Sequence, residues 1–537
     1  MNNQLLNNFI LALLPVLAFT AYLVKRLLRE LHMMQLHGYI NKRWWHWYQE
    51  PLTSKYYARD FLPLLTIPVF LAGYPQIAAV LGAFLYLFLF LIWKKPQEKK
   101  ALAMTARAKR LYYLSLAVLF CLDLGSLAVF YVYPGCGWLF LILTILTVFP
   151  FLPLLFANLL LIPVEKSINM SFYHDAQRII GEMPSLQVIG ITGSFGKTSC
   201  KMILGEILNE QYMTLITPAS YNTPMGITRV IRESLRPVHE IFVAEMGAKQ
   251  KGDIEELCQL VKPKIGILTA IGEQHLETFA SLENIINTKF ELIESLPEDG
   301  LAVLNFDNPY IRANAQKAVC PVISYGLEAD CDYWAEDIHY DSKGSRFMLR
   351  NKQDQSILLQ TVLLGKHNIY NILAAVAVAH QLGMSLEKIA RAVKKLTPIQ
   401  HRLCLMPHGG GYHVIDDAFN SNPAGFKAAL EVLATFSEGQ KIIITPGMVE
   451  LGSREAQLNK EAAIEAAKVC DYIILVGENH SLPLQEGLKE AAYPQERYYV
   501  AADLADARRK LQQIVKIGDI VLFENDLPDT YDEKKKK

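Results

Sequence analysis

The sequence predicts an α/β protein in three parts: an α-helical membrane region at residues 1–165, a P-loop central domain with a mostly parallel sheet at 180–400, and a Rossmann-like C-terminal domain at 401–533. Three observations predict this fold. Apolar and aromatic runs dominate the first 165 residues, strand–turn–helix patterns repeat after them, and a glycine-rich loop follows the first of these strands. At ~150 residues per domain, the chain length also implies roughly three domains.

The composition excludes several classes of protein. The 53 basic and 53 acidic residues give a formal net charge of zero, whereas a nucleic-acid-binding protein usually carries a basic excess. We therefore expect no nucleic-acid partner. The eight cysteines are scattered, with no Cys-x-x-Cys pair and no Cys/His spacing that would hold zinc. Free thiols in a reducing compartment are expected.

The first part of the chain contains four apolar runs: Leu5–Val24, Phe61–Trp93, Leu111–Tyr133 and Trp138–Pro163. The last two are each long enough to cross a hydrocarbon core of ~30 Å as a helix of ~20 residues. Basic residues follow the first run, whereas a secretory signal carries them before its apolar stretch. The sequence therefore predicts a membrane anchor and not a cleaved leader.

The second run has the segment Gly73-Tyr-Pro-Gln76 inside it, so it is either one long span or a hairpin of two. The loops at 25–60 and 94–110 each hold seven Lys or Arg residues, and none lies between Tyr133 and Trp138. Basic loops stay in the cytoplasm, so an even number of crossings separates these two, which favours the hairpin. About five spans in the cell membrane are predicted, with everything after Pro163 in the cytoplasm.

Two features of this region each have two interpretations. Asp123 lies within an apolar run, either as a functional intramembrane acid or as a polar group bonded to a neighbouring helix, and we favour the second. The aromatic residues Trp44, Trp45, Trp47 and Tyr48 lie beside basic residues. They suit a membrane interface and equally suit packing against neighbouring helices.

From residue 187 the pattern changes to strand, turn and helix. Val188–Ile191 is typical of a short buried strand, and the run Thr192-Gly-Ser-Phe-Gly-Lys-Thr198 leads from it into a helix over 199–208. Glycines let successive N–H groups point at phosphate oxygens, and the helix N-terminus adds its dipole. The loop therefore predicts that Lys197 reaches the β- and γ-phosphates of ATP and that the Thr198 hydroxyl binds Mg²⁺.

The glycines of this loop depart from the general Walker pattern. That pattern has a glycine where Ile191 stands, and the glycines here are Gly190, Gly193 and Gly196. A glycine-rich turn that merely precedes Lys-Thr is the alternative. The position between a strand and a helix favours the phosphate loop.

Two further strands end on residues that suit a metal–nucleotide site. The strand over 240–245 ends on Glu245, and the strand over 264–269 leads into a loop that contains His275. Ligands gather at the carboxyl ends of the strands in an open parallel sheet. We therefore expect both side chains to converge on the nucleotide with the phosphate loop.

Several stretches of this half of the chain resemble the Mur ligase family, the ATP-dependent amide-forming enzymes of peptidoglycan synthesis, and most of all its D-alanyl-D-alanine-adding members. They occur in the family's order and cover roughly half of the chain. The matching stretches are Thr192-Gly-Ser-Phe-Gly-Lys-Thr-Ser199, Tyr221-Asn-Thr-Pro-Met-Gly-Ile227, Ala244-Glu-Met-Gly-Ala248, His275-Leu-Glu277, Asn287-Thr-Lys-Phe-Glu291, Gly365-Lys-His-Asn-Ile-Tyr-Asn371, His401-Arg-Leu403, Asp416-Asp-Ala-Phe-Asn-Ser-Asn-Pro423 and Gly447-Met-Val-Glu-Leu-Gly452.

The resemblance implies a set of catalytic and metal-binding residues. Glu245 and His275 would hold a second Mg²⁺, and Lys289 would be a carbamylated lysine beside the metal ions. Without the family, Lys289 is typical of a surface lysine on a helix. Together with Lys197 these three residues would be catalytic, and with Thr198 they would hold the metal ions.

The resemblance also implies binding sites for ATP and for the amine. The ATP site would combine the phosphate loop, an adenine-binding segment, one residue at the junction to the third domain and two residues of that domain. These are, in that order, Gly193, Ser194, Gly196, Lys197, Thr198 and Ser199; His367, Asn368 and Asn371; Arg402; and Asp416 and Asp417. Asn420 and Asn422 would line the side of the amine substrate.

These residues suit the activation of a carboxylate. By the resemblance, a substrate carboxylate attacks the γ-phosphate of ATP while Mg²⁺ and Lys197 neutralise the charge on the phosphoryl oxygens. An amine then attacks the acyl phosphate and gives an amide. The expected partners are the lipid membrane and a carboxylate and an amine substrate, possibly lipid-linked. The expected role is in the synthesis of cell-envelope precursors.

The sequence departs from the family in two places. Family members that use a UDP-sugar-peptide carry an N-terminal domain that binds UDP, and here the predicted membrane region takes that place. The D-alanyl-D-alanine-adding enzymes have a Lys-Gly-Ser-Arg run after the last strand, where this chain has an acidic segment, Glu524–Asp529, before its terminal lysines. Two other hypotheses stay open: a membrane-bound ligase for another polymer, of the poly-γ-glutamate type, and a non-catalytic nucleotide-binding membrane protein.

Overall fold

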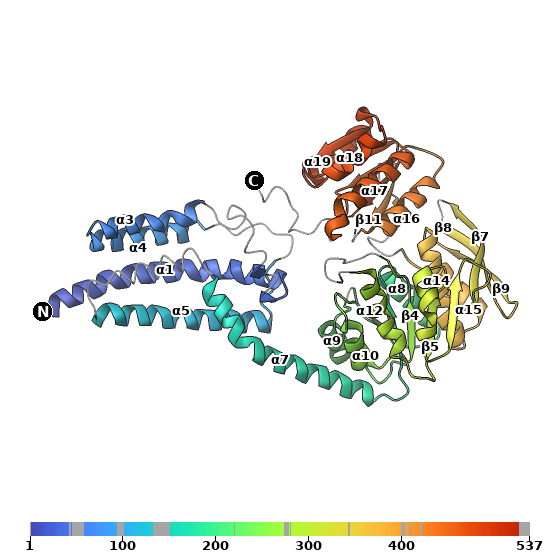
Figure 1. The fold of residues 1–537 in the computed structure, drawn as a ribbon, viewed down its shortest axis with the longest axis horizontal. Coiled ribbons are helices and arrows are strands. Elements are labelled where there is room, and N and C mark those ends of the chain that lie inside the picture. The colour runs from blue at the N-terminus through green and yellow to red at the C-terminus, as the bar shows by residue number, and fades with distance from the viewer. Residues whose placement is uncertain are drawn as a thin grey trace. The chain divides into compact units, whose positions relative to one another are not determined.

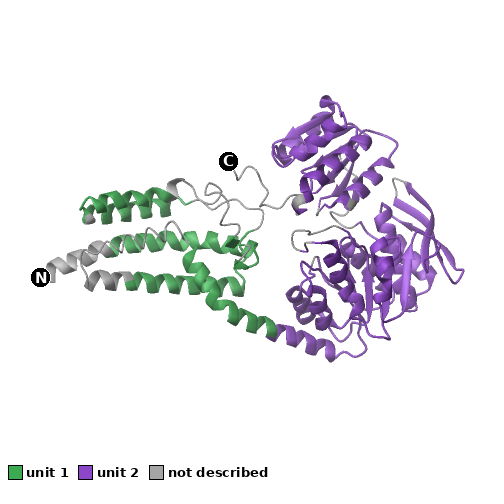
Figure 2. Ribbon diagram, in the orientation of Figure 1, with its two compact units in different colours: residues 1–170, 529–537 green, residues 171–528 purple. Residues whose placement is uncertain are grey.

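The computed structural model describes residues 2–41, 44–45, 58–93, 101–132, 151–219, 221–272, 279, 281–341, 344–398, 403–407, 410–418, 421–449 and 451–525. The chain divides into two compact units (Figure 2). Unit 1 comprises Met1–Met170 with Asp529–Lys537, and unit 2 comprises Ser171–Pro528. The seven cysteines in the described part of the chain are free thiols, as expected.

Unit 1 is helical. Its elements are α1 (Asn2–Leu36), η2 (Ala58–Leu65), α3 (Thr66–Leu71), α4 (Pro75–Leu91), α5 (Ala106–Val132) and the first part of α7 (Leu152–Gly181). Helix α1 packs against α4 and α5 (Figure 1). Side chains such as Phe19, Leu23 and Leu27 are fully buried in this core.

The second apolar run folds as the predicted hairpin. Helix α3 ends at Leu71, α4 begins at Pro75, and the two helices pack against each other. Gly73 has φ 86° in the turn between them, a conformation that glycine adopts without strain. Pro75 suits the first turn of α4 because a proline there removes no helical hydrogen bond.

The lengths of the helices differ from the predicted spans. Among the described residues, one helix is long and apolar enough to cross a membrane, Leu152–Gly181; Phe61–Leu71 and Gln76–Leu91 are apolar but shorter. The described part of the fourth apolar run lies in α7, and this helix continues beyond the run, through Pro163, to Gly181. Proline removes only one hydrogen bond from the helix, and contacts on both sides of it hold the helix together. The arrangement of about five spans therefore stays a prediction.

Polar groups inside unit 1 pair with one another across helices. Arg110 donates two hydrogen bonds to the buried Glu165. Asp123 accepts a hydrogen bond of 2.8 Å from Thr20, so the structure favours the bonded polar group over the functional acid. Trp44 is fully buried with its ring 5.1 Å from that of Phe151, which fits packing between helices, whereas Trp45 is 48% exposed, and Trp47 and Tyr48 lie outside the described residues.

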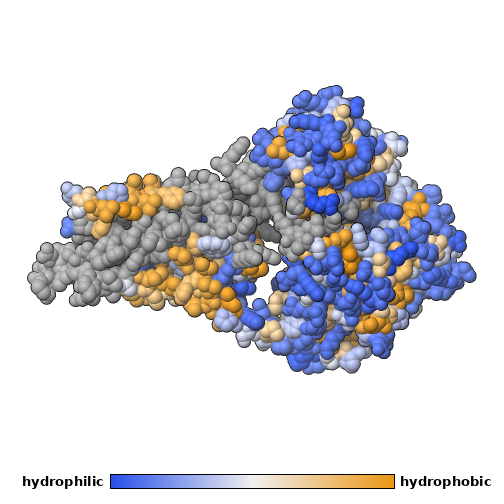
Figure 3. All heavy atoms as spheres, in the orientation of Figure 1, coloured by the Kyte–Doolittle hydropathy of each residue, from blue (hydrophilic) through white to orange (hydrophobic). Residues whose placement is uncertain are grey.

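Apolar side chains cover much of the outer surface of unit 1. On the face drawn in Figure 3, hydrophobic residues gather over these helices, whereas unit 2 is mainly hydrophilic. Phe84, Leu91, Phe120 and Leu159 are each at least half exposed. A soluble surface rarely carries large apolar side chains at this density.

The central part of unit 2 is a nine-stranded sheet with the order β2-β3-β1-β4-β5-β6-β7-β8-β9 (Figure 1). The first seven strands in this order are parallel to their neighbours, and β7, β8 and β9 are joined antiparallel. The strands are β1 (Gln187–Thr192), β2 (Thr214–Ile216), β3 (Ile241–Glu245), β4 (Ile265–Leu268), β5 (Leu301–Asn305), β6 (Val322–Gly326), β7 (Tyr333–Asp341), β8 (Gly344–Asn351) and β9 (Ser356–Thr361). The mostly parallel central sheet is thus confirmed.

Helices cover both faces of this sheet. One face packs against α8 (Lys197–Leu208), α14 (Lys366–Gln381) and α15 (Leu386–Lys395). The other face packs against α9 (Pro224–Ser234), α10 (Asp253–Val261) and α12 (Leu282–Glu294). Successive side chains of a strand point to opposite faces, so Ile189 and Ile191 enter the first core and Val188 enters the second. The short helices α13 (Pro309–Asn314) and η3 (Ala315–Lys317) follow β5.

The last eleven residues of α7 belong to unit 2. The hydroxyl of Tyr173 donates to the Glu256 carbonyl at 3.1 Å, and the Gln177 amide donates to the Gln259 carbonyl at 3.0 Å. Asp175 pairs with Arg232 of α9 at 2.7 Å. These contacts hold the end of α7 against α9 and α10.

The C-terminal part of unit 2 is a six-stranded sheet with the order β10-β11-β15-β12-β13-β14, antiparallel only between β10 and β11. The strands are β10 (Cys404–Pro407), β11 (His413–Asp417), β12 (Lys441–Thr445), β13 (Tyr472–Val476), β14 (Tyr498–Ala501) and β15 (Ile520–Glu524). The helices are α16 (Pro423–Ala434), η4 (Gly452–Arg454), α17 (Glu455–Val469), α18 (Leu482–Glu490), η5 (Gln495–Arg497) and α19 (Leu504–Ile514). The predicted Rossmann-like parallel strands are present.

Candidate active site

The glycine-rich loop lies between β1 and α8 and passes close to the end of β4. A Cβ atom at Gly193 would lie 2.1 Å from the Thr269 hydroxyl and 3.0 Å from the Ala270 carbonyl oxygen. Gly196 has φ 84°, and a Cβ atom there would meet the Asn371 side chain at 2.9 Å. The loop therefore needs glycine at these two positions, and its path leaves backbone amides available for an anion at the start of α8.

Substitution of Gly193 by alanine is expected to weaken the binding of Mg²⁺–ADP by at least about tenfold, because the loop must move away from β4. The associated strain lowers the free energy of unfolding by about 1–3 kcal/mol. Urea unfolding and nucleotide titration measure the two effects. Gly252→Ala is the matched control, since Gly252 also has positive φ but has open space around it. Unchanged nucleotide affinity in Gly193→Ala would contradict this account of the loop.

The polar residues of the loop are held in place around Lys197. The Lys197 ammonium donates to the carbonyls of Gly193 and Ser194 at 2.7 and 3.1 Å. The Ser194 hydroxyl bonds to the Gly272 carbonyl at 3.0 Å. The lysine thus lies over the loop that would hold the phosphates, and Ser199 is buried on the first turn of α8.

Glu245, at the end of β3, is the centre of a buried cluster. One carboxylate oxygen, Oε1, accepts from the Thr198 hydroxyl at 3.2 Å and from the Asn222 amide at 3.1 Å. The other oxygen, Oε2, pairs with the Lys201 ammonium at 2.9 Å. The parallel register of β1 and β3 places Glu245 opposite Ile191, directly before the loop. The predicted convergence of Glu245 and Thr198 is therefore present.

The donor atoms of this cluster fit Mg²⁺. The Thr198 hydroxyl and Glu245 Oε1 are oxygen ligands that already lie together beside the phosphate loop, and Mg²⁺ prefers oxygen ligands at nucleotide phosphates. Within the described ranges no group of three or more His, Cys, Asp or Glu side chains is assembled that could hold a metal ion. His275 lies outside the described residues, so the second predicted metal site stays a prediction.

Lys289 lies on α12 and is buried, not on the surface. Its ammonium lies 5.9 Å from the centre of the Phe279 ring. Burial, together with the nearby charge of Lys197, lowers the pKa of Lys289 from 10.5 to about 7. A large fraction of the side chain is therefore the neutral, nucleophilic amine near neutral pH.

The shifted pKa of Lys289 predicts a pH-dependent stability. The folded chain binds fewer protons than the unfolded chain between pH 7 and 10.5, so its free energy of unfolding rises with pH in this window, by up to about 1.4 kcal/mol per pH unit. Below pH 7 the folded protein carries the full penalty of the buried charge. We expect Lys289→Met to be more stable than the wild type at pH 6.5 and to lose this advantage by pH 9.5, measured by urea unfolding. The control Lys394→Met, at an exposed lysine of α15, should give no such pH-dependent difference.

Asn371 is the predicted adenine-segment residue that lies nearest the loop. Its Oδ1 faces Gly196, and its buried Nδ2 makes no hydrogen bond within the described structure. An unsatisfied buried donor is a candidate for a ligand contact. Asn368 is different: its amide donates to the Leu364 carbonyl at 2.8 Å, inside the protein. His367 packs against Gly365 at the start of α14.

The sequence analysis missed a group of residues at the end of β5. The Asn305 and Asn308 amides donate to the carbonyls of Thr269 and Ile271, which ties this end to that of β4. Asp307 accepts from the Tyr370 hydroxyl at 2.7 Å and from the Leu327 amide at 2.8 Å. The sequence could have indicated this group, because the run Asn305-Phe-Asp-Asn308 begins on the last residue of a buried strand, and ligands gather at strand ends.

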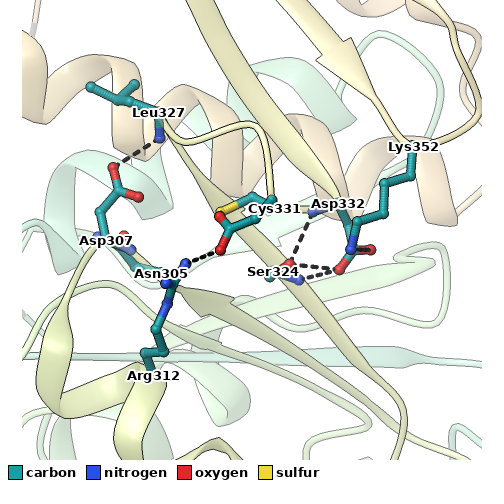
Figure 4. A network of polar contacts seen from close by, with 9 residues as sticks. Asn305, Asp307, Arg312, Ser324, Leu327, Cys331, Asp332 and Lys352 are labelled. Atoms are coloured by element: carbon teal, nitrogen blue, oxygen red, sulfur yellow. Dashed lines mark hydrogen bonds and ion pairs between the residues drawn. The ribbon is translucent and has the colours of Figure 1, made fainter.

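Figure 4 shows Asp307 in a polar network between β5 and β6. Ser324 and Asp332 exchange hydrogen bonds, Lys352 pairs with Asp332 at 2.9 Å, and Arg312 pairs with Asp330 at 2.7 Å. The carboxylates of Asp330 and Asp332 have partners in this network. The buried Oδ1 atom of Asp307, in contrast, makes no hydrogen bond within the described structure. This atom is a second candidate for contact with the nucleotide.

The C-terminal domain places several predicted residues at the ends of its strands. Asp417 Oδ1 accepts from the Leu403 amide, and Asp416 Oδ1 accepts from the Ala418 amide. The Asn422 side chain caps α16 by accepting from the Gly425 amide at 3.0 Å. Arg402 and Asn420 lie outside the described residues. The nucleotide and amine roles of this group therefore stay predictions.

Glu524 lies beside Asp417 at the end of β15. Its carboxyl is buried and accepts a hydrogen bond of 2.5 Å from the Ser421 hydroxyl. Burial, with the neighbouring Asp417 carboxylate, raises the pKa of Glu524 well above its usual range. The acidic segment noted in the sequence thus begins inside the protein, and its residues from 526 onward lie outside the described ranges.

A phosphate loop at the start of a doubly covered parallel sheet, with an oxygen-ligand cluster beside it and a separate Rossmann-like domain, defines a nucleotide-dependent enzyme of the ligase class. Two family models match the chain: the Mur ligase middle domain at residues 191–379 and the Mur ligase, glutamate ligase domain at 401–524. The chain belongs to the Mur ligase family, as the resemblance predicted.

Named relatives and solved structures agree with this assignment. UDP-N-acetylmuramoyl-tripeptide--D-alanyl-D-alanine ligase of Bacillus subtilis is 30% identical over 340 residues, which cover 63% of this chain and 72% of the relative. The Escherichia coli enzyme of the same name is 29% identical over 332 residues, 61% and 72% of the two chains. The Thermotoga maritima MurF ligase in complex with ADP has a TM-score of 0.61 and 26% identity, covering 68% and 82% of the two chains. MurF from Acinetobacter baumannii has a TM-score of 0.61 and 25% identity, covering 68% and 79%.

Proposed function

We propose that this chain is an ATP-dependent ligase that joins a carboxylate to an amine through an acyl phosphate, in the synthesis of peptidoglycan or related cell-envelope precursors. The observation that carries the proposal is the phosphate loop with Thr198 and Glu245 hydrogen-bonded beside it, together with the buried Lys289, whose pKa the nearby charge of Lys197 helps to lower. The name of its relatives, UDP-N-acetylmuramoyl-tripeptide--D-alanyl-D-alanine ligase, supports the same reaction class.

The residues of the cluster have distinct tasks in this reaction. The loop amides and Lys197 bind and orient the β- and γ-phosphates, and Lys197 stabilises the charge that develops on the transferred phosphoryl group. Thr198 and Glu245 would hold Mg²⁺, which supplies further charge neutralisation at the phosphates. Because an acyl phosphate hydrolyses in water, the site must exclude solvent until the amine attacks.

Lys289 is the residue for which the proposal requires a chemical modification. A carbamate forms when a neutral amine attacks CO₂ and its nitrogen then releases one proton to solvent, and burial keeps much of this side chain neutral near pH 7. The resulting carboxylate would add a negative oxygen ligand beside the phosphate loop. The proposal therefore includes a bicarbonate requirement for full turnover.

The substrates are the least specified part of the proposal. The relatives' name points to a UDP-sugar tripeptide and D-alanyl-D-alanine, whereas the helical region at the N-terminus suits a lipid-linked carboxylate. The test is ADP release by the purified full chain with either form of the carboxylate, each with and without D-alanyl-D-alanine. Amine-dependent release supports the proposal, and the mass of the product distinguishes a peptide bond to this dipeptide from a γ-glutamyl polymer. Release that never depends on an amine would refute it.

We also propose that unit 1 attaches the enzyme to the cytoplasmic face of the cell membrane. Large apolar side chains on its surface, such as Phe84 and Leu159, and the basic loops of the sequence support this placement. We expect the full chain to stay in the membrane pellet after an alkaline carbonate wash and to dissolve only in detergent. Release by carbonate alone would contradict the placement.

A further inference from the structure

Lys201 is a fully buried charge one helical turn after Lys197. Its ammonium pairs with Oε2 of Glu245 at 2.9 Å and donates to the Ala219 carbonyl at 2.5 Å. Both side chains of the pair are almost completely excluded from solvent, at 0% and 2% exposure. A buried ion pair of this kind is a weak source of stability, because apolar residues of similar volume often stabilise a core as well or better. The packing of α8 therefore gives no reason for a charge here.

The pair does fix the orientation of Glu245. Three donors from two segments divide the carboxylate between them: Lys201 of α8 takes Oε2, while Thr198 of the same helix and Asn222 before α9 take Oε1. The backbone amide of Glu245 is held as well, by the Thr217 hydroxyl at 3.1 Å. Oε1 consequently faces Thr198 in the first turn of α8, next to the phosphate loop, and Oε2 is paired with Lys201 one turn further along the same helix.

We infer that Lys201 is a positioning residue that makes Glu245 a one-oxygen metal ligand and thereby gives the nucleotide site its preference for Mg²⁺ over Ca²⁺. This inference rests on the proposed function in one respect, the binding of a divalent cation with the nucleotide by Thr198 and Glu245. It adds the cation selectivity of the site and the residue responsible for it.

The physical reason lies in the different coordination of the two ions. Mg²⁺ is small and requires near-octahedral geometry with ligands at about 2.0–2.1 Å, whereas Ca²⁺ accepts six to eight oxygens at about 2.3–2.6 Å and often takes both oxygens of a carboxylate. A carboxylate whose second oxygen is held by a buried ammonium cannot become bidentate without breaking the ion pair. Without Lys201, Glu245 could turn and offer both oxygens.

The test is the affinity of the detergent-purified full chain for a fluorescent ADP analogue, titrated with Mg²⁺ and separately with Ca²⁺. This binding measurement does not depend on turnover. For Lys201→Met we expect the half-saturating Mg²⁺ concentration to rise about tenfold or more, as for other residues that orient metal ligands. We expect the half-saturating Ca²⁺ concentration to change little, so that the ratio of the Mg²⁺ value to the Ca²⁺ value rises by about tenfold.

Two further variants keep the test decisive. Lys394→Met removes an exposed lysine of α15 and should leave both titrations unchanged. Lys201→Gln keeps a hydrogen-bond donor for Oε2 without the charge; it should retain part of the Mg²⁺ preference and replaces Lys201→Met if that variant does not fold. The inference would be overturned if a folded Lys201 variant had the same ratio of half-saturating Mg²⁺ to half-saturating Ca²⁺ concentration as the wild type. Wild-type binding that is independent of any divalent cation would instead refute the metal-binding part of the proposed function.

Discussion

Replacement of Lys197 by methionine is expected to lower amine-dependent ADP release by about 10³-fold or more. The Lys197 ammonium lies over the loop, bonded to the carbonyls of Gly193 and Ser194, where it can turn to the phosphates when a nucleotide binds. Loss of one positioned group that stabilises transition-state charge typically lowers turnover by about 10²–10³-fold, and more in phosphoryl transfer. Because the methionine keeps the apolar stem of the side chain, the fold should remain intact.

The measurement is steady-state ADP release at saturating ATP, together with the unfolding midpoint of the same preparation. Lys395→Met is the matched control, since Lys395 lies on the surface and pairs with Glu210; it should keep wild-type turnover. A loss below about tenfold in Lys197→Met would remove this lysine from the chemistry. If the Lys197→Met preparation were largely unfolded under the assay conditions, the loss of turnover would have a structural cause.

Glu245→Gln is expected to have the second-largest effect, because it removes the proposed Mg²⁺ ligand and leaves the Lys201 ammonium buried without its anionic partner. Breaking one side of a buried ion pair lowers stability by about 3–5 kcal/mol. Turnover should fall by about 10²-fold or more from the lost Mg²⁺ ligand. Urea unfolding and ADP release measure the two effects on one protein.

The double variant Lys201→Met/Glu245→Gln separates these effects. It removes the unpaired charge, so most of the lost stability should return while turnover stays low. Additive losses of stability in the double variant would show that the two side chains do not interact. Recovered turnover would show that Glu245 acts only through the fold.

The phosphate loop was predictable from the sequence because its chemistry is local. The glycines, the lysine and the following hydroxyl residue all lie within one strand–loop–helix unit. A Cβ atom at Gly193 would clash with the Thr269 hydroxyl, which explains the glycine there. The parallel sheet followed from continuous apolar strands such as 188–191. Glu245 was recognisable as the last residue of a strand in that sheet, next to the loop in the register of β1 and β3.

Residues that act through long-range contacts were not predictable in this way. Lys201 has the spacing of an ordinary helix lysine, and only the packing of α8 against β3 makes it a buried partner of Glu245. Lys289 was expected on the surface without the family and is buried. Helix α7 also has partners that lie far away in the sequence, since Glu165 bonds to Arg110 and Tyr173 bonds to Glu256.

The measurement that tests the central claim most directly follows oxygen from the carboxylate substrate into phosphate. The full chain is supplied with ATP, D-alanyl-D-alanine and the UDP-sugar tripeptide or its lipid-linked form, labelled with ¹⁸O in the terminal carboxylate. If the chain forms an acyl phosphate, one ¹⁸O atom should appear in the inorganic phosphate for each amide formed, and Lys197→Met should abolish the transfer. Amide formation with unlabelled phosphate, or ADP release with neither amide nor labelled phosphate, would contradict the account.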